Sequence, residues 1–349
     1  MKKFLNSPET LLEDSLDGFV AAHADIVVAG DERKFIRRKT LAPGKVALIS
    51  GGGSGHEPLH AGFVGLGMLD AACPGQIFTS PTPDQMAAAV EAVDQGAGVI
   101  LIVKNYEGDV MNFEMAAEMT DGRCAAVITD DDVAVETSTY STGRRGVAGT
   151  LIVEKIVGAA AETGMPRAEL QALGQGVNRR TRSMGVALTS CTVPAAGKPN
   201  FELGDKEVEM GVGIHGEPGR RRVPLASARE MVEEMVKAIL VDLAPKRGAE
   251  TILFVNGFGA TPLIELYLLY HEAARVIAGA GLKPTRSLVG SYVTSLDMAG
   301  ASITLSLLEG PAAGLWDAPV HTAALAGACE DRGPIILSIV VILPRLGGH

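Results

Sequence analysis

Short apolar runs alternate with amphipathic stretches in the first half of the chain, which predicts strands separated by helices. The apolar runs predict buried strands at 46–50, 98–103 and 125–129. Apolar positions at helical spacing predict helices around 84–93, 110–119 and 147–163. A helix is also predicted near the N-terminus, capped by Ser7 and with Pro8 in its first turn. This alternation is typical of βαβ units and a mostly parallel sheet.

The pattern changes near residue 183, where more strands follow one another directly. Strands are predicted at 185–190, 208–214, 251–255, 288–294 and 302–308, and helices at 226–243 and 263–280. A chain of 349 residues is long for a single core and suits two domains. We therefore predict an α/β protein with mixed, largely parallel sheets flanked by helices. Its first domain covers residues 1–183 and its second begins at residue 184.

Polar residues follow the predicted strands of the first domain directly. His56, Asp109 and the acidic run 130–132 each lie in a loop after an apolar run. Ligands of open parallel sheets bind beyond the carboxyl ends of the strands. These loops are therefore expected to meet at one edge of the sheet.

The segment GGGSGHEP at 51–58 has four glycines within five residues. Such a loop lets the backbone approach a ligand and present N–H groups, although a tight turn explains a glycine cluster equally well. It has neither the Walker A pattern nor the Rossmann spacing. His56 favours a binding site, because its ring can accept or donate a proton beside exposed amides.

Lys104 and Asp109 follow the next strand, and His215 lies in the glycine-flanked segment GVGIHGEPG at 211–219. Asp109 alone is explained equally well as a helix N-cap, and Lys104 can form an ion pair or bind a ligand oxygen. His56, Asp109 and His215 together raise the alternative of a metal site, but no pair has the spacing of a helix-face metal motif. The remaining histidines interpreted as structural are His23, His60, His271 and His321.

The acidic run 130–132 and the pair Arg144–Arg145 are less specific. The run can bind magnesium, but helix capping and a solvated loop are the simpler interpretations. The arginines can pair with this run, or face a phosphate or an acidic partner.

Composition limits the partners and the cellular compartment that are expected for this chain. The formal net charge of −10 argues against nucleic acid and anionic membranes as partners. The four cysteines have no CxxC pair, which is typical of reduced thiols in a cytoplasmic protein. The N-terminus lacks the apolar run of a signal peptide, and the apolar segment 334–344 is too short for a membrane-spanning helix.

The motifs taken together resemble the dihydroxyacetone kinase K subunit family, in fixed order and as far as about residue 325. The matching phrases are GKVALISGGGSGHEP (44–58), CPGQIFTSPTPDQ (73–85), IVKNYEGDVMNFE (102–114), TDDDVAV (129–135), GRRGVAGT (143–150), CTVPAAGKP (191–199), GVGIHGEPG (211–219), GATPLIELY (259–267), TSLDMAG (294–300) and LWDAPVHT (315–322). The tail 326–349 does not resemble the ending of the family, so the second domain is expected to cover 184–325.

The resemblance implies that dihydroxyacetone binds as a covalent hemiaminal on His215. It also implies substrate contacts from Gly53, Ser54, Gly55, His56, Lys104 and Asp109, with His56 and Asp109 as acid/base groups. It implies two α/β domains in a homodimer. A neutral imidazole nitrogen can add to a ketone, so the adduct would select a short ketone over glycerol.

No cofactor is expected on this chain, because the ATP-dependent members carry a fused nucleotide domain that this sequence lacks. The resemblance then implies a partner L subunit that holds ADP and magnesium and is recharged by a phosphohistidine carrier of the phosphotransferase system. Two alternatives remain: a non-catalytic dihydroxyacetone sensor that controls a transcription factor, and a kinase subunit for a longer ketose such as erythrulose.

Overall fold

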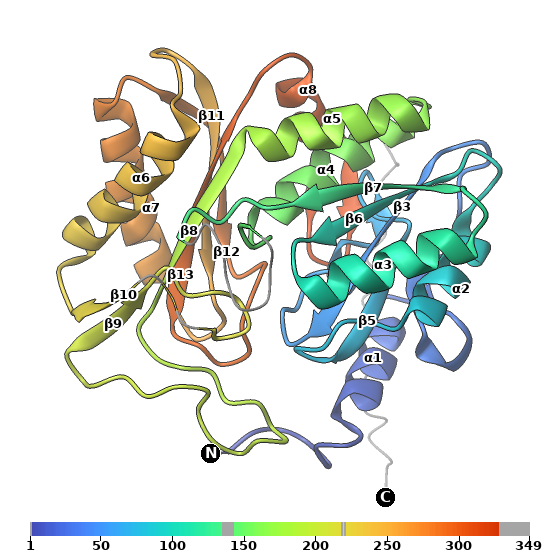
Figure 1. The fold of residues 1–349 in the computed structure, drawn as a ribbon, viewed down its shortest axis with the longest axis horizontal. Coiled ribbons are helices and arrows are strands. Elements are labelled where there is room, and N and C mark those ends of the chain that lie inside the picture. The colour runs from blue at the N-terminus through green and yellow to red at the C-terminus, as the bar shows by residue number, and fades with distance from the viewer. Residues whose placement is uncertain (1, 135–142, 218, 220, 328–349) are drawn as a thin grey trace, which may run out of the picture.

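The computed structural model describes residues 2–134, 143–217, 219 and 221–327. Two six-stranded sheets stand side by side, and helices cover both faces of each (Figure 1). Helices α4 (Gly149–Glu162) and α5 (Arg167–Arg179) lie between the sheets. The order of layers is helices, first sheet, helices, second sheet, helices. The predicted α/β class with mixed sheets flanked by helices is confirmed.

The first sheet has the strand order β1-β2-β5-β3-β6-β7. Its parallel strands are β3 (Ala47–Ser54), β5 (Ala71–Ile77), β6 (Val99–Lys104) and β7 (Cys124–Thr129). At one edge, β1 (Val27–Ala29) and β2 (Ile36–Arg38) pair antiparallel. Helices α2 (Pro83–Val93) and α3 (Glu107–Met119) cover the outer face. This half of the chain has the parallel topology expected from its pattern.

The second sheet is not largely parallel, so that part of the prediction is wrong. Its strands, in spatial order, are β10 (Arg221–Pro224), β9 (Glu207–Met210), β8 (Thr181–Ala187), β13 (Gly300–Leu307), β11 (Glu250–Gly257) and β12 (Lys283–Gly290). Only β11 and β12 pair parallel, because only they are joined by a helical crossover, α7 (Leu263–Gly279). Strand β13 lies between β8 and β11, antiparallel to both. Helix α6 (Ala228–Leu243) packs with α7 on the outer face.

Several helices and strands begin or end at residues other than those predicted. Strand β3 continues through the glycines as far as Ser54. Helix α1 (Leu11–Ala22) begins after Thr10, because Ser7 accepts a hydrogen bond from the Thr10 N–H in a preceding turn. The pattern missed helix α5 and the strands β1, β2, β5 and β10. It also missed a small sheet, together with the helix beside it; these elements are β4 (Gly65–Leu66), β14 (Val320–Thr322), β15 (Ala326–Gly327) and α8 (Ala312–Asp317).

A continuous apolar core joins the two halves. Every residue of α4 from Gly149 to Ala161 is buried, and the same cluster includes side chains of β6 and of β11. The predicted boundary at 183 falls inside β8, and the division into domains stays a prediction.

Helices long and apolar enough to cross a membrane are absent from the described part of the chain. The apolar segment 334–344 and most of the tail lie outside it. Three cysteines of the described part are free: Cys73, Cys124 and Cys191.

Candidate functional site

A cavity of about 720 Å³ lies between the carboxyl edge of the first sheet and the loop after β9 of the second. Its wall includes Gly53 near the end of β3, Asp109 at the start of α3, and His215. The parallel pairing of β3 with β6 explains why loops that are far apart in sequence meet here. Three of the residues predicted from the sequence therefore share one cavity.

His215 is the accessible histidine of the cavity, since 22% of its side chain is exposed. Three rings meet its imidazole edge to face: His56 and Tyr106, each with a centroid 4.6 Å away, and Phe78 at 5.4 Å. Such packing leaves the imidazole little freedom to rotate. The ring is therefore held in one orientation at the cavity wall.

Glu217 sits behind His215, with Oε1 3.7 Å from His215 Nδ1 and Oε2 accepting the His215 backbone N–H at 2.8 Å. Burial raises the pKa of the Glu217 carboxyl, but the His215 ring and Arg145 outweigh burial and bring it down to about 2. A carboxylate facing Nδ1 favours a proton on that nitrogen. The Nε2 lone pair is then available to a ligand.

His56 is completely buried, and its Nδ1 lies 2.8 Å from the Thr294 carbonyl. A carbonyl only accepts hydrogen bonds, so Nδ1 carries the proton and Nε2 is unprotonated. Burial, His215 and Lys104 hold the pKa of His56 well below its usual value, so the ring stays neutral. Within the described part of the chain, Nε2 is buried without a hydrogen-bond partner, and a ligand hydroxyl is the kind of donor that it needs.

Asp109 and Lys104 form a buried ion pair, with Asp109 Oδ2 3.2 Å from Lys104 Nζ. Ser80 also donates a hydrogen bond to the Asp109 carboxylate. The N-cap of α3 is Tyr106, so the interpretation of Asp109 as an N-cap is wrong. Lys104 does form an ion pair, one of the two alternatives that the sequence left open.

The glycines of the loop allow this close packing. A Cβ on Gly52 would lie 2.2 Å from Lys104 Nζ, and one on Gly53 would lie 2.6 Å from the backbone of Thr79. The Ser54 hydroxyl donates to the Gly75 carbonyl, and the Gly55 N–H donates to Glu57. Both groups therefore bond within the protein.

In the acidic run, Asp131 and Asp132 are buried and structural, whereas Asp130 is partly buried and accepts a hydrogen bond from Asn178. Asp131 accepts hydrogen bonds from the N–H groups of Val147 and Gly149 near the start of α4, and Asp132 pairs with the buried Arg145. The solvated-loop interpretation is therefore wrong. Arg145 cannot face a partner, because its side chain is 0% exposed. In the described part of the chain, groups of three or more His, Cys, Asp or Glu that could hold a metal ion are absent.

His60 was interpreted from the sequence as structural, and Glu154 was not identified. His60 Nδ1 lies 2.6 Å from Glu154 Oε1, and His60 Nε2 lies 3.1 Å from Lys104 Nζ. All three side chains are buried. The one signal in the sequence was the position of His60, in the same loop as His56.

The raised pKa of the buried Glu154 carboxyl predicts how the stability of the folded chain depends on pH. Burial raises the pKa of its carboxyl from 4.5 to about 8, although Lys104 partly opposes this. Between these values the folded chain binds a proton that the unfolded chain has lost, so stability falls as pH rises. From about pH 5.5 to about pH 7.5, the stability advantage of the wild type over Glu154→Gln should shrink by about 2–3 kcal/mol. Urea denaturation at both pH values measures this, and parallel changes in the two proteins would contradict it.

Comparison with known proteins places this geometry in a family. The Dak1 domain model matches residues 17–324. The chain belongs to the Dak1 family. A PTS-dependent dihydroxyacetone kinase subunit of Listeria innocua, the dihydroxyacetone-binding subunit DhaK, is 50% identical over 88% of this chain and 95% of its own length. The DhaK subunit of the PEP-dependent kinase of Escherichia coli is 47% identical over 93% of this chain and 99% of its own.

Solved structures of Dak1 relatives have the same fold. The dihydroxyacetone kinase of C. freundii has a TM-score of 0.85 at 34% identity, over 93% of this chain and 60% of its own length. A dihydroxyacetone kinase operon co-activator, DhaQ, has a TM-score of 0.86 at 33% identity, over 90% of this chain and 98% of its own. Kinases and a co-activator therefore share this architecture.

Proposed function

We propose that this Dak1 chain is the dihydroxyacetone-binding subunit of a dihydroxyacetone kinase, and that it holds the ketone as a hemiaminal on His215. The observation that carries the proposal is the orientation of His215, with Glu217 behind Nδ1 and the cavity before the ring. The kinase subunits at 47–50% identity support the same substrate.

The covalent step uses side chains in the cavity wall and next to it. The Nε2 lone pair of neutral His215 bonds to the carbonyl carbon as the C=O π pair moves onto oxygen. Nδ1 loses its proton past Glu217 to the solvent, and the alkoxide oxygen takes one proton from solvent in the open cavity, so no net proton is gained or lost and the adduct is neutral. His56 Nε2 accepts a hydrogen bond from a substrate hydroxyl. Asp109 then takes the proton of the hydroxyl that receives the phosphoryl group.

The phosphoryl donor belongs to a partner subunit in this proposal. Phosphoryl transfer depends on positioning and on positive charge around the phosphates, and the sequence has no Walker A motif and a net charge of −10. A partner L subunit carrying ADP and magnesium would supply both, and a phosphocarrier protein would recharge it. The homodimer stays a prediction.

Purified chain mixed with ATP, magnesium and dihydroxyacetone should therefore form no dihydroxyacetone phosphate. Product should appear once an L subunit and its phosphoryl source are added, as a coupled enzymatic assay would measure. Sustained ATP-dependent turnover by this chain alone would refute the partner-subunit proposal.

The likeness to the DhaQ co-activator favours one second candidate, a sensor that binds dihydroxyacetone without catalysis. The same reconstituted assay separates the two functions. A sensor would retain the ligand on His215 and yet give no product with the L subunit.

A further inference from the structure

The Lys104 ammonium already has as many acceptors as protons. It has three N–H groups, and its neighbours are the Gly51 carbonyl at 3.1 Å, His60 Nε2 at 3.1 Å and Asp109 Oδ2 at 3.2 Å. A substrate oxygen could contact Lys104 only by sharing one of these protons. We therefore infer that the main role of Lys104 is to bind the carboxylate of Asp109, which lines the cavity.

His60 can hold Lys104 only in one tautomer. Nε2 must be unprotonated to accept from an ammonium, so Nδ1 carries the proton and donates it to Glu154 Oε1 at 2.6 Å. Burial, Lys104 and His56 keep the pKa of His60 well below its usual value, so the ring is neutral. Glu154 lies on the buried helix α4. Because its raised pKa keeps Glu154 protonated near neutral pH, Oε1 acts as a carbonyl oxygen that accepts this proton, and the tautomer is set by the Lys104 ammonium on the other side of the ring.

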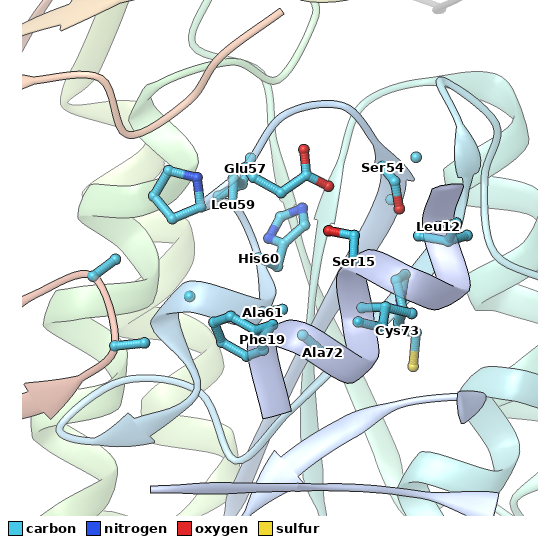
Figure 2. A pocket seen from close by; sticks show the side chains of 18 of the residues that line it. Leu12, Ser15, Phe19, Ser54, Glu57, Leu59, His60, Ala61, Ala72 and Cys73 are labelled. Carbon is cyan, nitrogen blue, oxygen red and sulfur yellow. The ribbon is translucent and has the colours of Figure 1, made fainter. Parts of the chain in front are cut away.

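The His60 side chain, which contacts Lys104, also lines a second cavity. Figure 2 shows His60 in the wall of this cavity of about 450 Å³, with Ser15 and Phe19 of α1 also facing it. Gly53 borders both cavities, while His60 borders only the second. His60 is therefore placed to act on the site without touching the substrate.

We propose that His60 and Glu154 are positioning residues that fix Lys104, and through it the Asp109 carboxylate, in the orientation that catalysis requires. This inference rests on the proposed function, because it concerns the same reaction. Asp109 has only two side-chain partners in the described part of the chain, Lys104 and Ser80. Loosening Lys104 would leave the carboxylate free to rotate about its contact with Ser80.

Two substitutions at His60 separate positioning from packing. The amide of Gln can place its carbonyl oxygen near the original Nε2, so His60→Gln keeps an acceptor for Lys104. The shorter Asn reaches only the original Nδ1 position, so His60→Asn keeps a partner for Glu154 and loses Lys104. The cavity beside the ring gives both side chains room.

In the complex with the L subunit and its phosphoryl source, His60→Asn should lower kcat by about 10²-fold, the effect of a misplaced catalytic group. His60→Gln should stay within about tenfold of the wild type, as expected after the loss of one neutral hydrogen bond. Dihydroxyacetone binding, measured by calorimetry, should be unchanged in both variants, because His215 is untouched. Equal losses of kcat in the two variants would overturn the proposal.

A spectroscopic readout keeps this test independent of the proposed function. A buried, fully bonded ammonium exchanges its protons slowly and gives a ¹⁵N–¹H signal in lysine-labelled protein. The Lys104 signal should persist in His60→Gln and vanish in His60→Asn and Glu154→Leu. Its persistence in all three variants would refute positioning even if the wild type proved inactive, whereas an inactive wild type with this signal pattern would refute only the kinase proposal.

Discussion

Replacing His215 by alanine is expected to abolish retention of dihydroxyacetone. A ligand of so few atoms gains little from non-covalent contacts alone, so its apparent affinity should fall by about 10²–10³-fold. Dihydroxyacetone labelled with ¹³C at C2 measures the bond directly. On the wild type the bound carbon should resonate in the tetrahedral range, and on His215→Ala no protein-bound signal should remain.

The exposed His271 on α7 offers a matched control. His271→Ala should bind dihydroxyacetone like the wild type, and the wild type should not retain glycerol, which has no carbonyl carbon to attack. Unchanged binding in His215→Ala, or equal affinity for glycerol, would show that the ketone is held without the covalent bond.

Replacing Asp109 by asparagine is expected to stop turnover while leaving the ligand bound. Asparagine keeps the shape of the side chain and can still accept from Ser80 and Lys104, but it cannot take a proton from the hydroxyl. General-base catalysis typically contributes about 10²–10⁴-fold, so kcat in the reconstituted complex should fall by about that factor. The ¹³C signal of the adduct should persist.

Glu107 provides the comparison for Asp109, because it lines the same cavity and is exposed. Glu107→Gln should turn over like the wild type if the effect belongs to the base rather than to any negative charge near the ligand. Near-normal turnover by Asp109→Asn would instead limit Asp109 to holding Lys104.

The sequence predicted the parts of the fold that depend on local pattern. Apolar runs located β3, β6 and β7, and their parallel order explains why Lys104 and Asp109 meet the loop of His56. The second sheet was harder, because β13 lies between β11 and a strand, β8, that precedes it by more than a hundred residues. Local periodicity carries no information about such pairing.

The parts of the site that were missed depend on burial. For Arg145 the sequence left open a pairing with the acidic run or exposure to a phosphate or partner; it pairs with Asp132 of the run, but its complete burial and its contact with Glu217 were not predicted. Glu154 sits in a helix whose sequence reads as ordinary core, and its partner His60 is 94 residues away. A single sequence does not distinguish a buried acid from an exposed one before the helix is placed between two sheets.

The position of α4 between the sheets has a consequence for how the chain acquires its site during synthesis. The strands of the first sheet and α4 leave the ribosome before most of the second sheet has been synthesised. The apolar side of α4 that packs against the second sheet is therefore exposed to solvent until that sheet forms. The cavity is also incomplete until then, because His215 in its wall is synthesised only after β9. A nascent chain stalled before this point would carry Asp109 and His56 but would lack the histidine on which we propose that the ketone is held.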